Sequence, residues 1–166
     1  APVIAVFSSS VFVFASAIRG QGGRPSSSAA AVAFAVVLLV FLQLRILDEF
    51  KDFEQDRRFR PYRPVPRGIV TLRELGGLGV AAAFAQVAAS ALVGTRALVA
   101  LAVVWAYAAL MATEFFVPAW LKAHPVAYMA SHMVVIPLIV AYVATCAGAR
   151  TPAAPLMWLA GMSYLS

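Results

Sequence analysis

The chain consists of long apolar runs separated by short polar segments. A helix needs about 20 apolar residues to cross the hydrocarbon core of a membrane, and six runs approach or reach that length. They lie at 1–18, 27–47, 74–94, 97–117, 126–147 and from Pro152 to Ser166, the last being short for a span. None shows the alternating polarity of a membrane β-strand. The pattern predicts an all-α, polytopic transmembrane helix bundle that forms a single membrane domain over 1–166.

Proline and capping residues mark several ends of these runs. Thr71 and Glu74 form a capping-box pattern at the start of the third run. In such a box each of the two side chains accepts a hydrogen bond from the backbone N–H of the other residue. Pro118 is expected to close the fourth run and Pro125 to open the fifth. Pro137 lies inside the fifth run and predicts a kink there, because proline removes a helical hydrogen bond.

Composition agrees with a lipid environment. Hydrophobic residues make up 63% of the chain and charged residues only 12%, against about 25% charged in soluble domains. The net charge of +6 could indicate nucleic-acid binding, but the basic residues lie between predicted membrane segments, where orientation rules account for them. We therefore expect no nucleic acid and contact with membrane lipids. Gly76, Gly77 and Gly79 in the third run predict close helix packing, or reflect an alanine-rich composition.

Charge is concentrated in residues 45–73, here called the charged segment. It holds five of the seven acids and eight of the thirteen Lys and Arg residues. Alternating spans would place it on the same side as residues 118–125, and the excess of Lys and Arg there predicts the cytoplasmic side. We expect a cytoplasmic loop that carries the functional motif.

Three aspartates of the charged segment share one helical face. Asp48, Asp52 and Asp56 follow one another at intervals of four residues and fall within an arc of roughly 80°, with Glu49 at its edge. Like charges at this spacing repel, and a cation between them would relieve the repulsion. Mg²⁺ together with a diphosphate suits such oxygen ligands, and the arginines that follow could contact the phosphates. The alternative is a solvated helix end whose acids are neutralised by nearby Arg and Lys.

The residues after the acids add a resemblance to a known family. Asp52-x-x-x-Asp56 is followed by Arg63-Pro64-Val65-Pro66-Arg67-Gly68. This combination resembles the first Asp-rich motif of the UbiA superfamily of intramembrane prenyltransferases, and it follows two membrane segments as in that family. Asp48 stands where the family has Asn, and Glu49 stands where it has Asp.

The resemblance implies an integral membrane prenyltransferase. Such a protein would use Mg²⁺ to transfer an isoprenyl group from its diphosphate to a hydrophobic acceptor, aromatic or lipid. Catalysis would rest on Asp52 and Asp56, and diphosphate binding on Arg60 and Arg63. The metal ligands implied are Asp48, Glu49, Asp52 and Asp56. Because the family has about nine membrane helices and a second Asp-rich motif, we expect this chain to be the N-terminal part of such a domain, with the second motif beyond residue 166.

Two further residues are candidates for polar roles inside the bundle. Glu114, the only acid far from the charged segment apart from Glu74 at its border, could face the same cavity or form an interfacial pair with Lys122. His132 could relay protons or be hydrogen-bonded as a neutral side chain within the bundle. The aromatic residues between these positions are expected to be packing or interfacial residues, although cation–π stabilisation of an allylic cation is an alternative.

Two other functions remain open from the sequence. The altered first motif favours a non-catalytic, UbiA-like accessory subunit of a larger membrane complex. A transporter or channel with an acidic ladder is the third hypothesis, and the confinement of the acids to one edge argues against it.

Overall fold

The computed structural model describes residues 9, 12, 13 and 27–148 of the 166-residue chain. The described helices are, in order, α2 (Ser27–Phe59), α3 (Leu72–Val93), α4 (Thr95–Ala112), the 3₁₀ turn η1 (Glu114–Phe116), α5 (Pro118–Ala123), α6 (Pro125–Met133) and α7 (Val135–Cys146). The predicted segment from Pro152 lies outside the described residues, and so does the segment 1–18 except for residues 9, 12 and 13.

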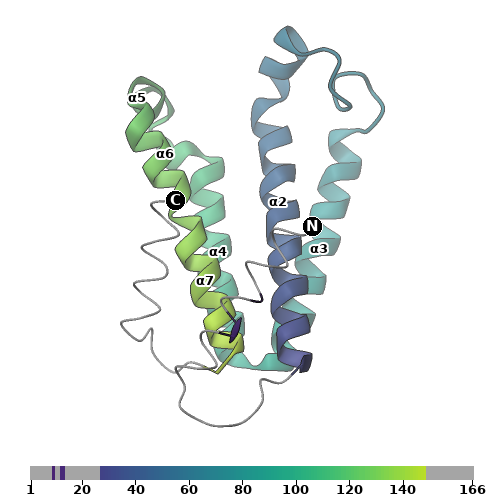
Figure 1. The fold of residues 1–166 in the computed structure, drawn as a ribbon. Coiled ribbons are helices and arrows are strands. Elements are labelled where there is room, and N and C mark those ends of the chain that lie inside the picture. The colour runs from purple at the N-terminus through teal and green to yellow at the C-terminus, as the bar shows by residue number, and fades with distance from the viewer. Residues whose placement is uncertain (1–8, 10–11, 14–26, 149–166) are drawn as a thin grey trace.

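The helices form two packed pairs (Figure 1). α2 packs along α3, and α4 packs along α7. The pairs meet near the end of the bundle that carries the α3–α4 connection and diverge toward the opposite end, where α2 and the α5–α6 region stand apart. Val36 and Val37 of α2, Leu101 of α4, and Ile139 and Val143 of α7 are fully buried where the pairs meet.

Four helical stretches are long and apolar enough to cross a membrane. They are Ser27–Phe59, Leu72–Val93, Thr95–Ala112 and Pro125–Cys146, the last comprising α6 and α7. Much of their apolar surface points outward: the side chains of Leu92 and Phe84 on α3 are 84% and 73% exposed. The described part of the protein is therefore an all-helical bundle compatible with a multi-pass membrane protein, as the sequence predicts.

The charged segment is largely helical rather than a loop. α2 continues without interruption through all five of its acids and ends at Phe59, so only the stretch between Phe59 and Leu72 connects α2 to α3 as a loop. The expectation of a loop over 45–73 is wrong for its first half. No proline or glycine occurs between Ser27 and Pro61, so nothing in the local sequence breaks the helix earlier.

The capping box in front of α3 is confirmed. The Glu74 backbone N–H donates to the Thr71 hydroxyl oxygen at 3.2 Å, and the Thr71 backbone N–H donates to the Glu74 carboxylate at 2.8 Å. These bonds satisfy two donors that a helix start otherwise leaves unpaired. The cap fixes the point where the chain re-enters the bundle after the charged segment.

α4 ends earlier than the sequence predicts, at Ala112 rather than at Pro118. The Thr113 hydroxyl donates to the Leu110 carbonyl at 3.0 Å, and the next three residues have positive φ angles of 49°, 54° and 61°. A left-handed turn of non-glycine residues costs about 1–2 kcal/mol per residue. Pro118 opens α5 instead of closing α4.

The kink predicted from Pro137 occurs as a break between α6 and α7 at Val134. It lies three residues before the proline because Pro137 has no N–H for the carbonyl four residues earlier, that of Met133. Pro125 begins α6, as predicted.

Candidate functional site

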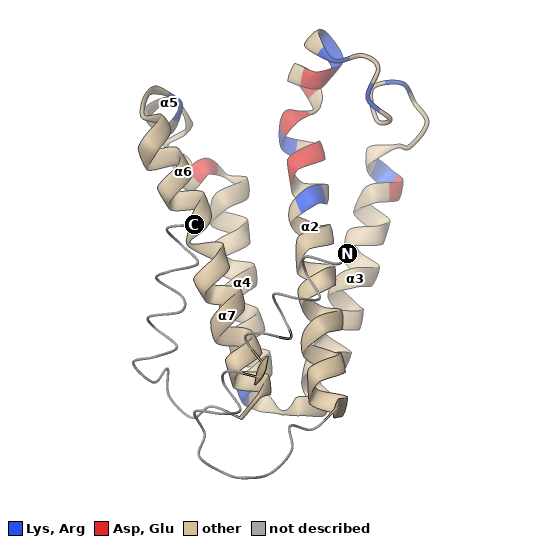
Figure 2. Ribbon diagram, viewed as in Figure 1, with Lys and Arg blue, Asp and Glu red and all other residues tan. Residues whose placement is uncertain are grey.

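Charged residues are concentrated at the end of the bundle opposite the α3–α4 connection, here called the open end (Figure 2). The end of α2, the loop after it, the start of α3, and the η1–α5 region all carry charges there, and the membrane-length parts of the helices between the two ends are almost free of them. This arrangement confirms that the charged segment and residues 118–125 lie at the same end of the bundle.

Two of the four predicted metal ligands are engaged by arginines. Asp56 is only 3% exposed, and its carboxylate accepts a hydrogen bond from Arg63 and lies 3.7 Å from Arg60. Glu49 is paired with Arg45 one turn earlier on α2. Arg60 and Arg63, the predicted diphosphate contacts, are thus partners of a predicted metal ligand. The Asp56–Arg63 pair holds the loop against the end of α2.

The other two acids are available for a ligand. Asp48 is exposed and Asp52 is half-buried. Among the described residues neither forms an ion pair with a basic side chain. They lie one turn apart on the same face of α2, so their charges repel across a short distance.

The donor set suits Mg²⁺ only in part. Within residues 9, 12, 13 and 27–148, no group of three or more His, Cys, Asp or Glu side chains is placed to hold one metal ion. Mg²⁺ often binds through one or two carboxylates together with phosphate oxygens and water. The pair Asp48 and Asp52 fits that smaller requirement, whereas Glu49 and Asp56 are each already paired with an arginine.

An apolar pocket of about 350 Å³ lies between α2, α3 and α4. Leu47 and Phe50 of α2 line it next to Asp48 in the sequence, and Gly79, Ala83 and Trp105 contribute from the facing helices. Its volume falls in the range of ~300–1,000 Å³ typical of ligand pockets. Gly76 and Gly79 face α2, where an added Cβ would contact Phe50 and Ile46, but Gly77 faces open space.

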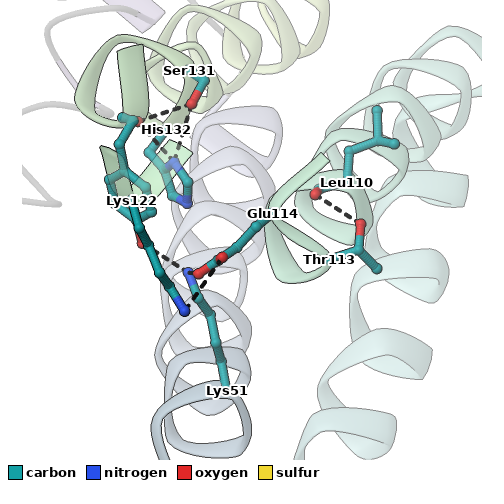
Figure 3. A network of polar contacts seen from close by, with 8 residues as sticks. Lys51, Leu110, Thr113, Glu114, Lys122, Ser131 and His132 are labelled. Carbon is teal, nitrogen blue, oxygen red and sulfur yellow. Dashed lines mark hydrogen bonds and ion pairs between the residues drawn. The ribbon is translucent and has the colours of Figure 1, made fainter. Parts of the chain in front are cut away.

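A polar network joins the two helix pairs at the open end (Figure 3). The Lys51 ammonium of α2 lies 2.9 Å from the Glu114 carboxylate of η1 and donates to the Tyr128 hydroxyl of α6 at 2.7 Å. Lys122 of α5 approaches the second oxygen of Glu114 to 3.8 Å. Glu114 is therefore paired with Lys122, as one alternative expected, but its closer partner is Lys51.

The Glu114 carboxylate is buried, at 5% exposure. Burial alone would raise its pKa, but the hydrogen bond and charge of Lys51, together with the charge of Lys122, outweigh burial, so the pKa of Glu114 lies below its ordinary value. Glu114 is thus ionised at neutral pH and accepts hydrogen bonds without donating any.

His132 of α6 lies beside this network. Its Nδ1 is 2.9 Å from the Tyr128 carbonyl oxygen, and its ring stacks on the Tyr128 ring with centroids 4.1 Å apart. The Phe115 ring meets it edge-on at 6.2 Å. These contacts agree with the expectation of a histidine that is hydrogen-bonded within the bundle.

Sequence reasoning missed Lys51 and Tyr128. Both lie far from Glu114 in the sequence, and no spacing rule connects α2 with η1 or α6. The one available signal was that a single intramembrane acid requires a cation, and Lys51 is the only lysine in the charged segment.

Comparison with protein-family models, with curated proteins and with solved structures gives no match to this chain. The resemblance to the UbiA superfamily accordingly rests on the motif residues of α2 and of the loop after it, and it stays a prediction.

Proposed function

We propose that the protein is an integral membrane, UbiA-like prenyltransferase that binds an isoprenyl diphosphate at the open end of the bundle and transfers its prenyl group to a hydrophobic acceptor. The observation that carries this proposal is an apolar pocket lined by Leu47 and Phe50, in the same stretch of α2 that carries the acids Asp48 and Asp52. An isoprenyl diphosphate has the same division into an apolar chain and a charged head. The charged end faces the cytoplasm in this proposal, because Lys and Arg predominate there.

Each part of the site would act on one part of the substrate. The pocket between α2, α3 and α4 holds the chain away from water, and the face of α2 presents Asp48 and Asp52 to Mg²⁺ at the diphosphate. The bound ion would supply charge neutralisation for the departing diphosphate. The exposed Arg57 and Arg58 add positive charge near the phosphates. Arg63 keeps Asp56 and the loop in place rather than contacting the substrate.

The decisive experiment measures Mg²⁺-dependent transfer of a radiolabelled farnesyl group by the full-length protein in proteoliposomes. Asp48→Ala and Asp52→Ala should each lower the rate at least about tenfold, because each removes an oxygen ligand. Glu54→Ala is the matched control, since Glu54 lies exposed on the same helix outside the acidic face. Normal rates for both the Asp48→Ala and the Asp52→Ala protein would refute the site.

A second candidate is the non-catalytic accessory subunit. The engagement of Asp56 by Arg63 favours it, because a buried ion pair of this kind serves structure in the absence of any substrate. Asp56→Asn distinguishes the two roles of this residue: a lower melting temperature with unchanged diphosphate binding identifies a structural residue, and lost binding with unchanged melting identifies a ligand.

A further inference from the structure

The chain from the end of α2 to the start of α3, residues 57–73, carries charge of one sign. It contains six arginines and no acid. Two of the six pair with Asp56, as described above. Of the other four, Arg67 and Arg73 lie toward α3 and are exposed, and within the described residues neither forms an ion pair. This half of the connection therefore presents positive charge to whatever surrounds the bundle.

The turn that carries Arg67 is held by its own hydrogen bonds. The backbone N–H of Gly68 donates to the Val65 carbonyl oxygen at 2.9 Å, and that of Ile69 donates to the Pro64 carbonyl oxygen at 3.0 Å. Gly68 supplies the left-handed conformation of the turn, with a φ of 76°, and the Val65 side chain is buried. A turn ordered in this way binds a partner at a smaller entropic cost than a flexible loop would.

Exposed apolar side chains accompany the two arginines. Tyr62 and Ile69 belong to the same connection and are 70% and 62% exposed. Water disfavours such surface, whereas the interface of a membrane accepts an aromatic or apolar body beside a charged group. Arginines next to exposed apolar side chains are typical of a segment that rests on lipid headgroups.

The length of α3 places this half of the connection at the membrane surface. The 22 residues of α3 extend about 33 Å at 1.5 Å per residue, close to the hydrocarbon thickness of about 30 Å. Arg73 is the second residue of α3 and therefore lies at the headgroups when α3 spans the core, and Arg67 precedes it by less than two helical turns of sequence. α3 lies on the side of α2 away from the α5–α6 region (Figure 1), so these arginines border the surrounding lipid rather than the opening between the helix pairs.

The chemistry of the two arginines suits a phosphate group. A guanidinium stays charged at any physiological pH, and its planar fork binds two phosphate oxygens at once. The cytoplasmic leaflet, which the charged end is expected to face, carries anionic lipids that attract basic segments next to a membrane helix. Tyr62 and Ile69 would gain nothing from a free phosphate, so they favour a lipid as its source.

We propose that Arg67 and Arg73 bind the phosphate of an anionic phospholipid in the leaflet around α3. Tyr62 and Ile69 contact the part of the lipid between the headgroup and the acyl chains. Such a lipid holds the connection against the membrane surface. The inference does not rest on prenyl transfer, because neither arginine is assigned to the diphosphate.

Native mass spectrometry of the detergent-solubilised full-length protein tests the proposal. The protein is equilibrated with equal amounts of phosphatidylglycerol and phosphatidylcholine that carry the same acyl chains, and the lipids retained on the protein are counted. We expect phosphatidylglycerol to be retained at least about tenfold more than phosphatidylcholine, because two arginines favour an anionic over a zwitterionic headgroup. Equal retention of the two lipids would overturn the proposal.

Variants locate the lipid. Arg67→Gln and Arg73→Gln each remove one charge and keep a polar side chain, and each should lower the preference for phosphatidylglycerol about fivefold. Arg96→Gln is the matched control: like Arg73, Arg96 is exposed and is the second residue of a membrane-length helix, but it lies at the opposite end of the bundle. An unchanged preference in the first two variants would contradict the site. An equal loss in the Arg96→Gln protein would also contradict it, since net charge alone would then select the lipid.

Competitors separate the lipid from other phosphates. Pyrophosphate carries charge without acyl chains, and a short RNA carries a row of phosphates. At the concentration of the lipid neither should displace phosphatidylglycerol, because neither buries apolar surface against Tyr62 and Ile69. Displacement by pyrophosphate would assign the arginines to a soluble diphosphate, and displacement by RNA would assign them to nucleic acid. Either result would overturn the lipid assignment.

Discussion

At the scale of single residues, Lys51 links α2 to both η1 and α6. It reaches Glu114 and Tyr128 from α2 and lies 5.0 Å from the centroid of the Tyr128 ring. The side chain of Lys51 is 19% exposed and that of Glu114 is 7% exposed, so both charged groups are largely removed from water. Each consequently depends on the other.

Replacing Lys51 by methionine should destabilise the protein. Removal of one partner from a fully buried ion pair costs about 3–5 kcal/mol, and the loss here should be smaller because Lys122 stays 3.8 Å from Glu114. Thermal unfolding in detergent, followed by circular dichroism, should show a lower melting temperature. Adding Glu114→Gln to Lys51→Met should recover part of the loss, and strictly additive effects would show that the two side chains are not coupled.

Glu114 also predicts how stability depends on pH. Its pKa is lower in the folded protein than in the unfolded chain, because the lysine pairing outweighs the burial that on its own raises it. A lowered pKa contributes stability above the unfolded value, and that contribution is lost as pH falls through the folded value. Melting temperatures measured between pH 7 and pH 3 should therefore fall less steeply for Glu114→Gln than for the unmodified protein. Parallel curves would assign the acid sensitivity to other groups.

At the scale of elements, the structure separates what local sequence determines from what it does not. The start of α3 could be predicted because Thr71 and Glu74 are three residues apart and satisfy each other. The break at Val134 could also be predicted, because its cause, Pro137, lies only three residues further along the chain. The left-handed turn at Glu114 could not, because the contact that accompanies it comes from Lys51, 63 positions earlier in the chain.

The α3 cap gives a local prediction. Thr71→Ala removes the acceptor of the Glu74 N–H, and N-cap losses of this kind cost about 0.5–2 kcal/mol. The melting temperature should fall by a few degrees. Thr113→Ala is a useful comparison, since the Thr113 hydroxyl bonds only to carbonyls of the preceding turn and caps no helix start. A larger loss for Thr113→Ala would mean that the end of α4 matters more than the start of α3.

The pocket gives a second prediction at this scale. Gly79→Leu should place a side chain into the apolar pocket and lower prenyl transfer, because Gly79 lines the pocket. Gly77→Leu makes the same change two residues away on α3, where an added Cβ meets nothing within 4 Å. We expect transfer to fall at least about tenfold in the first variant and to stay normal in the second. The comparison is informative because both variants gain similar helix propensity.

At the scale of the whole molecule, the sequence determined the class of architecture well. The long apolar runs predicted the four membrane-length helices that the structure describes, and the spacing of Asp48 and Asp52 predicted their common helical face. The candidate site was harder to predict from the sequence, because Arg63 and Arg45 pair with two of the acids. Composition cannot show which of several nearby cations pairs with which carboxylate.

The common end of the charged segment and α5 predicts a labelling pattern. In a protein with Cys146 replaced by alanine, single cysteines at Arg67 and Lys122 should be protected from a membrane-impermeant maleimide in intact cells and should react after permeabilisation. A cysteine at Arg96, next to the α3–α4 connection at the opposite end, should react in intact cells. The reverse pattern would place the charged end outside the cytoplasm, and equal labelling of all three would contradict the bundle topology.

The length of α2 has a further consequence. Its 33 residues extend about 50 Å at 1.5 Å per residue, and the hydrocarbon core is only about 30 Å thick. Roughly 20 Å of the helix thus extends beyond the acyl chains into the headgroups and water, and Asp48, Asp52 and Asp56 follow one another on that part at intervals of about 6 Å. These carboxylates therefore lie at different heights above the acyl chains, and the depth of a bound head group in the membrane determines which of them it can reach.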